Sequence, residues 1–181
     1  MRADAARNLE TVLTAGARLL AEDPAAGMAA IAAAAGVDRR TVYRRFASRE
    51  ELLAAVYQAR LDAIEEAVGT ARLTEAPVAV ALHRYAEGII AVNRKWPVEL
   101  ERMRADETIR ERRGRLIDRV DAFLLRAEEE GLLRADLPAG WASAVLRQHL
   151  QLASHSLPAL DAAQAADILV DSMLNGIGTR G

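Results

Sequence analysis

Apolar residues recur along this chain at intervals of three and four positions, the spacing that lines one face of an α-helix. No stretch shows the strict alternation of apolar and polar residues that marks a half-buried strand. The fold class is therefore predicted to be all-α. The periodic stretches predict about nine helices, over residues 9–22, 28–35, 39–46, 49–68, 82–96, 98–104, 109–127, 140–156 and 162–177.

Short polar residues and glycines delimit the first of these helices. Asp38 is predicted to be an N-cap, because its carboxylate can accept from the free backbone N–H groups of the turn that follows. Ser48 has Glu51 three residues later, which is the pattern of a capping box. Gly36 stands where a left-handed residue commonly ends a helix. Two short helices joined by a tight turn are therefore expected over residues 28–46.

Composition limits what else the chain can be. Its 181 residues suit one domain or two small modules, and the absence of cysteine excludes disulfides and thiolate metal sites. Only 4% of the residues are aromatic, so the core must be built from Ala, Leu, Val and Ile. No apolar run reaches the roughly 18 residues of a spanning helix, and the amino terminus lacks the apolar core of a signal peptide. We expect a cytoplasmic protein that does not associate with a membrane.

Charge is distributed unevenly, although the net charge is only −2. Residues 1–50 contain eight basic and six acidic side chains, whereas residues 51–181 contain sixteen basic and twenty acidic ones. Within the first group, eleven consecutive residues contain five arginines and no acid: Arg39, Arg40, Arg44, Arg45 and Arg49. A compact basic patch on an otherwise acidic chain is typical of nucleic-acid binding. The alternative, a solvated helix face, is less favoured because no acid neutralises the arginines locally.

A helix–turn–helix is predicted where the patch lies, with the first helix bracing an arginine-rich second helix for the major groove. The run IAAAAGVDRRTVYRRFASREEL, residues 31–52, resembles the amino-terminal signature of TetR-type (tetracycline-repressor-like) transcriptional regulators, and the resemblance extends over residues 9–57. It implies a three-helix DNA-binding domain over residues 1–50 and a helical effector-binding and dimerisation domain over 51–181. The implied function is that of a repressor which binds a palindromic double-stranded operator as a homodimer and is released by a small-molecule effector.

The resemblance also assigns roles to individual residues. It implies that Arg39, Arg40, Thr41 and Arg44 meet the major groove, and that Tyr43 and Arg49 contact the phosphate backbone. Arginine can form two hydrogen bonds with the O6 and N7 atoms of guanine, and a tyrosine hydroxyl can bind a phosphate oxygen without reading sequence. Arg45 can contact phosphate or pair with an acid of its own chain.

Two further sets of residues are candidates for a dimer interface and an effector pocket. Apolar and small residues stripe the last two predicted helices and can form a four-helix interface between subunits: Leu146, His149, Leu152, Ile168, Leu169, Ser172, Met173 and Gly176. A mainly aromatic set can line an apolar pocket: Tyr85, Ile89, Trp96, Met103 and Phe123. The interface set is equally compatible with the ordinary core of a helical domain. For the aromatic set, the core interpretation is favoured over the pocket.

An enzyme is not expected. His83 and Glu87 stand four residues apart, but no second pair of ligands completes a metal site. The chain has no glycine-rich phosphate loop and no nucleophile motif, so no catalytic residue, metal or cofactor is predicted. The alternative function is an all-helical interaction or small-ligand-binding protein without DNA binding, which would leave the arginine patch without a role.

Overall fold

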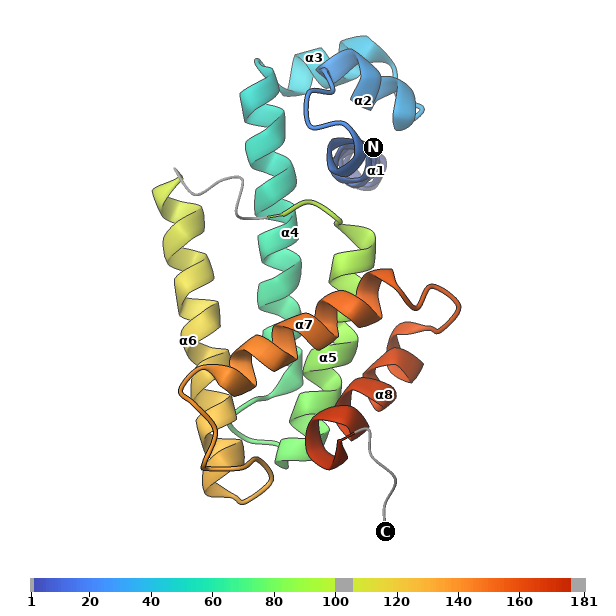
Figure 1. Ribbon diagram of the computed structural model, residues 1–181. Coiled ribbons are helices and arrows are strands. Elements are labelled where there is room, and N and C mark those ends of the chain that lie inside the picture. Colours follow the sequence, from blue (N-terminus) through green and yellow to red (C-terminus); the bar gives the residue numbers. More distant parts are fainter. Residues whose placement is uncertain (1, 100–105, 177–181) are drawn as a thin grey trace. The chain divides into compact units, whose positions relative to one another are not determined.

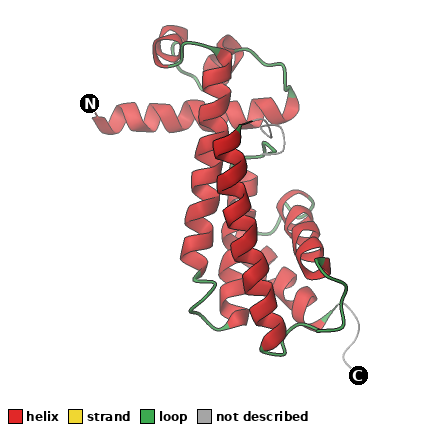
Figure 2. Ribbon diagram, turned by 90° about the vertical axis from the view of Figure 1, so that its left-hand side faces the viewer, coloured by secondary structure: helices red, strands yellow, loops and turns green. Residues whose placement is uncertain are grey.

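The computed structural model describes residues 2–99 and 106–176, and this part of the chain contains eight α-helices and no strand (Figures 1 and 2). The helices are α1 (Arg2–Glu22), α2 (Met28–Ala34), α3 (Arg39–Arg45), α4 (Arg49–Ala71), α5 (Val78–Lys95), α6 (Glu107–Glu129), α7 (Trp141–His155) and α8 (Ala162–Asn175). The all-α prediction is confirmed. The ninth predicted helix, over 98–104, falls largely outside the described residues. Over the described ranges, every helix is too short or too polar to span a bilayer.

The predicted signals at the ends of the first helices act largely as expected. Asp38 Oδ1 accepts a hydrogen bond from the backbone N–H of Arg40 at 2.6 Å, which makes it the N-cap of α3. Gly36 has a φ of 64°, in the left-handed region that glycine adopts without strain. Ser48 Oγ accepts from the N–H of Glu51 at 3.2 Å, but the Glu51 carboxylate accepts from Ala47 at 2.7 Å rather than from Ser48. The first bond of the predicted capping box is therefore present, but in the second bond the Glu51 carboxylate accepts from the residue before Ser48.

The chain divides into two compact units. Unit 1 comprises Met1–Asp62 and Lys95–Arg110, and unit 2 comprises Ala63–Arg94 and Glu111–Gly181. Three helices, α4, α5 and α6, therefore begin in one unit and end in the other.

Unit 1 is built around the contacts of α2 with α1 and α3. Its core consists of side chains that are at least nine-tenths buried: Val12, Ala17, Leu20, Ile31, Val42, Phe46, Leu52 and Val56. Gly16 lies where helices approach closely, because a Cβ atom at this position would be 3.2 Å from Val56 Cγ2 and 3.4 Å from Ile31 Cγ2. The close packing of α2 and α4 against α1 therefore depends on a small residue at this position.

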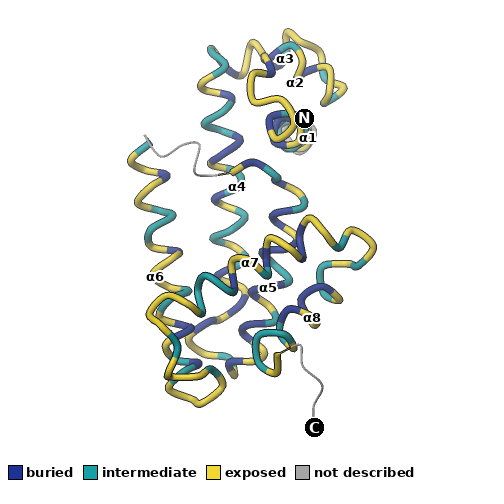
Figure 3. The backbone as a smooth tube through the Cα atoms, in the orientation of Figure 1, coloured by how far each residue is buried: buried dark blue, intermediate teal, exposed yellow. Residues whose placement is uncertain are grey.

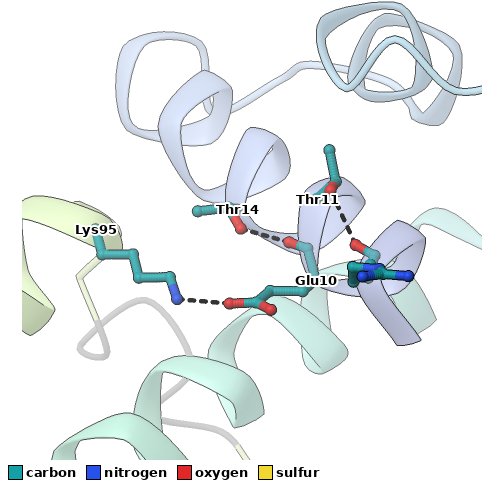
Figure 4. A network of polar contacts seen from close by, with 5 residues as sticks. Glu10, Thr11, Thr14 and Lys95 are labelled. Atoms are coloured by element: carbon teal, nitrogen blue, oxygen red, sulfur yellow. Dashed lines mark hydrogen bonds and ion pairs between the residues drawn. The ribbon is translucent and has the colours of Figure 1, made fainter. Parts of the chain in front are cut away.

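Residues 95–110 contribute to unit 1 from a distant part of the sequence. Trp96, Val98 and Ile109 are buried there, and Lys95 Nζ donates to Glu10 Oε1 at 2.6 Å (Figure 4). Because Lys95 stabilises the carboxylate, the pKa of Glu10 is lowered from its ordinary value. This ion pair joins the end of α5 to the side of α1.

Unit 2 has α7 packed on α8 and a core drawn from every helix of the unit. Buried and exposed positions alternate along its helices (Figure 3). Gly88 of α5 lies against α4, because a Cβ atom at Gly88 would be only 2.9 Å from the Cβ of Ala67. The core side chains include Leu82, Ile90, Phe123, Leu124, Leu146, Leu150 and Leu169.

Polar side chains also join the helices of unit 2. Arg94, the penultimate residue of α5, donates to backbone carbonyls at the end of α7 and in the turn before α8: those of Ala153, Leu157 and Leu160, at 2.9, 3.1 and 2.8 Å. Beside it, Asn93 Nδ2 donates to Ser154 Oγ at 3.1 Å in a buried position. The bond to Ala153 satisfies a carbonyl that the end of α7 leaves free, and all these bonds tie α5 to α7 and to the turn that follows it.

Candidate nucleic-acid interface

The turn between α2 and α3 is fixed by backbone bonds and by one side-chain cap. The N–H of Gly36 donates to the carbonyl of Ala33 at 3.1 Å, and the N–H of Val37 donates to that of Ala32 at 3.0 Å. Asp38 then caps α3 as described. The orientation of α3 relative to α2 is therefore set within seven residues by local chemistry.

Burial of one face of α3 decides where its arginines point. Val42 is 1% exposed and Phe46 is 5% exposed, so this side of the helix lies against the core of unit 1. Positions two residues before and two residues after Val42 lie about 160° away around an α-helix. These positions are Arg40 and Arg44, and both side chains are exposed. They project from the face directly opposite the core.

Arg39 and Tyr43 form a pair on one flank of that outward face. The Arg39 guanidinium lies 4.9 Å from the centroid of the Tyr43 ring, and its Nη2 donates to the Tyr43 hydroxyl oxygen at 3.2 Å. The two side chains stand four residues apart on α3, the spacing at which helical neighbours meet. Because the hydroxyl accepts from Arg39, its own proton is free to be donated to another acceptor.

Thr41 and Arg45 lie on the other flank, with Thr41 half-buried and Arg45 exposed. In the described part of the chain, the side chains of Arg40, Arg44 and Arg45 form no hydrogen bond or ion pair. Of the two possibilities for Arg45, pairing with an acid of its own chain is therefore not observed. Three guanidinium groups are left free for an external anion.

Arg49 is used differently from the other arginines of the patch. Its Nε donates to the carbonyl oxygen of Ala26 at 2.9 Å, and its Nη2 donates to that of Pro24 at 2.6 Å. The side chain is half-buried and ties the start of α4 to the loop between α1 and α2. The sequence pattern gave no sign of this role. Its contact with phosphate stays a prediction.

Comparisons with known proteins identify this arrangement. The profile described as "Bacterial regulatory proteins, tetR family" matches residues 12–56, which contain α2, the turn and α3. The HTH-type transcriptional repressor LfrR of Mycolicibacterium smegmatis is 30% identical over 182 residues, covering 96% of this chain and 92% of that protein. The chain belongs to the TetR family. It is thus a DNA-binding transcriptional regulator, and the predicted class of function is confirmed.

Solved structures of TetR-like regulators share the fold over almost the whole chain. The structure of LfrR from Mycobacterium smegmatis in complex with proflavine matches with a TM-score of 0.71 and 28% identity, covering 97% of this chain and 99% of that one. The regulator PfmR from Thermus thermophilus matches with a TM-score of 0.73 and 21% identity, covering 93% of this chain and 99% of that one. TetR proteins are transcriptional regulators rather than enzymes.

The three histidines of the chain make local contacts. His83 Nε2 lies 2.9 Å from Asp167 Oδ1, and its Nδ1 lies 3.9 Å from Glu87 Oε2. His149 and His155 each place Nδ1 against the carbonyl oxygen four residues earlier in α7, at 2.9 and 3.0 Å. The described residues contain no group of three or more His, Asp or Glu side chains that could hold a metal ion.

The candidate effector residues are divided between the two units. Tyr85, Ile89 and Phe123 are buried in unit 2, whereas Trp96 is buried in unit 1. Met103 lies outside the described residues. Burial raises the pKa of Tyr85 to about 12, the charges of Arg147 and Asp121 acting in opposite directions. Among the described residues, nothing forms a hydrogen bond with the Tyr85 hydroxyl.

The candidate interface residues are also divided, by burial. Leu146 and Leu169 are 1% and 2% exposed, so they belong to the core of their own unit. Leu152 and Ile168 are 56% and 51% exposed. His149, Ser172 and Met173 are half-buried, and Gly176 is exposed. The core interpretation applies to the first pair, and only the others leave surface for a partner.

Proposed function

We propose that this TetR-family regulator is a repressor that binds a palindromic double-stranded operator as a homodimer, with one α3 helix from each subunit in the major groove. The outward face of α3 carries this proposal, because it presents free guanidinium groups on a helix whose opposite face is anchored. The DNA contacts come from Arg39, Arg40, Thr41, Tyr43, Arg44 and Arg45, with Arg49 at the edge.

Repression as the sense of regulation is supported by the relative LfrR, which is named a transcriptional repressor. Operator occupancy by a dimer blocks access of the transcription machinery and requires no catalytic step. In this proposal, residues 1–50 contact DNA and residues 51–181 bind the effector and the second subunit. The protein then acts in the cytoplasm, where the operator is found.

The DNA-binding step is tested by selecting bound duplexes from a random pool and measuring the affinity of the selected sequence by fluorescence anisotropy. We expect a palindrome whose half-sites are about one helical turn apart, because a dimer places two recognition helices about 34–36 Å apart. Tyr43→Ala and Arg40→Ala should each weaken binding at least several-fold. Arg84→Ala, which removes an exposed arginine from α5, is the matched control and should leave affinity unchanged. Unchanged affinity in all three variants contradicts the proposal.

We infer that the exposed faces of α7 and α8 form the dimer interface. Leu152 and Ile168 are large apolar side chains left more than half exposed on these two packed helices. Exposed apolar surface of this kind is stabilised by burial against a second copy. Ile168→Glu should convert the protein to a monomer in light scattering. Val80→Glu, at a side chain 41% exposed on α5, should leave the dimer intact. A dimer in both variants contradicts this interface.

We infer that the effector binds in unit 2, near Tyr85. The hydroxyl of a buried side chain without a partner carries a desolvation cost that a ligand or a water molecule can remove. The complex of LfrR with proflavine indicates the class of ligand to test first, a planar aromatic cation with amino groups that can donate to the phenol oxygen. Ile89 and Phe123 supply further apolar surface in this unit.

Proflavine fluorescence titration tests this effector site. Binding should be measurable, and added proflavine should release a labelled operator. Tyr85→Phe, which removes only the hydroxyl, should weaken proflavine binding several-fold. Tyr43→Phe makes the same chemical change in unit 1 and should have no effect on the titration. Equal binding by the wild type and both variants excludes the Tyr85 hydroxyl from the effector site.

A further inference from the structure

The arginines of α3 differ in their position around the helix and in their hydrogen-bonding partners. These differences indicate different roles in DNA recognition. Arg40 and Arg44 lie opposite the buried Val42, whereas Arg39 and Tyr43 lie on a flank and bind each other. When a helix lies lengthwise in the major groove, the face opposite its protein core meets the base edges. Its flanks then face the phosphates that border the groove.

The hydrogen-bonding state of each side chain agrees with this division. The planar guanidinium of Arg40 or Arg44 makes no bond within the described chain, so its donors are available as a fork. Guanine offers two acceptors, O6 and N7, at the spacing that this fork matches, and no other base offers two acceptors on its major-groove edge. The Arg39–Tyr43 pair instead presents one positive charge and one hydroxyl proton, which suit a phosphate oxygen.

The distance between the two outward arginines sets the spacing of the bases that they reach. Four residues of α-helix rise about 6 Å. Successive bases of one strand are about 3.4 Å apart along the duplex axis. Two guanidinium groups with this separation therefore reach bases about two steps apart.

We propose that Arg40 and Arg44 each read one guanine, so that every operator half-site contains two guanines about two base-pair steps apart, while Arg39 and Tyr43 together bind the phosphate backbone. This inference rests on the proposed operator binding and adds the chemistry of the half-site to it.

The test uses the full-length protein and the duplex obtained by selection. Each guanine of one half-site is replaced in turn by 7-deazaguanine, which keeps O6 and base pairing but lacks the N7 acceptor. We expect two positions at which affinity falls about five-fold or more, since a bidentate pair contributes about 1–3 kcal/mol of discrimination. The other guanines should tolerate the replacement.

Variants then connect each base to one side chain. In Arg40→Ala, one of the two sensitive positions should become insensitive to 7-deazaguanine while the other stays sensitive. Arg44→Ala should give the reverse pattern. Arg39→Ala should leave both positions sensitive, weaken binding to specific and random duplexes alike, and reduce the slope of log affinity against log salt by about 1.

The outcomes separate this inference from the proposed function. A selected half-site without guanine, or tight binding that survives every 7-deazaguanine replacement, overturns the guanine assignment and leaves operator binding standing. If sensitivity to 7-deazaguanine disappears in Arg39→Ala instead of in Arg40→Ala or Arg44→Ala, the assignment of guanine to the outward arginines and phosphate to Arg39 is overturned. The complete absence of duplex binding removes the proposed function itself. All three arginines are exposed, and circular dichroism verifies that each variant remains folded.

Discussion

Two arginines of unit 2 and two arginines on the outward face of α3 in unit 1 serve opposite purposes. In unit 2, Arg94 donates to carbonyl oxygens of α7 and the following turn, and Arg112 pairs with Glu65, with Nη2 to Oε2 at 2.8 Å. In unit 1, Arg40 and Arg44 have no partner within the described chain. Asp38, two residues before Arg40, is occupied with capping the helix. The supply of acceptors around an arginine therefore decides whether it stabilises the fold or remains available for DNA.

The largest loss of stability is expected when Arg94 is replaced. Arg94→Met keeps much of the apolar stem but leaves several carbonyls of the α7–α8 connection without their donor. We expect the free energy of unfolding to fall by about 3 kcal/mol, since hydrogen bonds from charged groups are worth about 1.5–3 kcal/mol each and are not additive. Chemical denaturation measures this loss. Arg84→Met on the same helix, and Arg44→Met on α3, should change stability by less than about 0.5 kcal/mol.

A second difference is the environment of tyrosine. Tyr85 of unit 2 is buried, which raises its pKa to about 12, whereas Tyr43 of unit 1 is 45% exposed. A phenol whose pKa is higher in the folded state stabilises that state below its ordinary pKa of about 10, and the contribution is lost as the pH rises towards 12. The free energy of unfolding should therefore fall by about 2 kcal/mol over this range on account of Tyr85.

Subtraction isolates this contribution. The free energy of unfolding is measured against pH for the wild type and for Tyr85→Phe. The gap between the two curves should be constant up to about pH 10 and should change only above it. Parallel curves through this range would show that Tyr85 ionises equally easily in the folded and unfolded chain.

The helix caps give a matched pair of smaller changes. Asp38 caps α3 in unit 1, and Asp161 caps α8 in unit 2, where its carboxylate accepts from the N–H of Gln164 at 2.8 Å. Either aspartate changed to alanine should lower the free energy of unfolding by about 1 kcal/mol. Only Asp38→Ala should also weaken operator binding, because it loosens the helix that carries the recognition face. Equal operator affinities for the two variants would contradict the assignment of α3.

The smallest effect is expected for the ion pair between Lys95 and Glu10. Both side chains are about half exposed, so water and salt screen their interaction. Lys95→Gln should leave stability within the error of thermal unfolding at high salt, with any loss appearing only at low ionic strength. A double-mutant cycle with Glu10→Gln measures the coupling. A coupling that survives high salt would show that this pair is structurally stronger than its exposure indicates.

The helix–turn–helix elements of unit 1 were predictable from the sequence because local chemistry determines them. Asp38 acts two residues away and Gly36 acts on its own backbone. Helix α1 ends at Glu22, the last residue of the predicted range 9–22. The outward position of Arg40 and Arg44 follows from their spacing to Val42 on a helix. Short-range information therefore sufficed for the candidate recognition face.

Contacts between distant segments were not predictable in the same way. Arg94 bonds to residues about sixty positions later, and the spacing of apolar residues in α5 contains no sign of this. The stripe of Tyr85, Ile89 and Trp96 is continuous in sequence, yet the boundary between the units separates Trp96 from the other two. Periodicity identifies a buried face but not the surface that buries it. For the same reason, the sequence did not show that Leu146 is buried in the core whereas Leu152 is exposed.

The isolation of the outward α3 arginines has a consequence for how the protein can change. Arg40, Arg44 and Arg45 contribute no bond to the described chain, so exchanging them leaves the scaffold of Val42, Phe46 and Arg49 intact. If α3 binds DNA as proposed, new side chains at Arg40 and Arg44 should alter the preferred operator with little effect on the stability of the fold. The candidate recognition surface can therefore change by mutation or by design while the fold is kept, and the set of regulated genes would change with it.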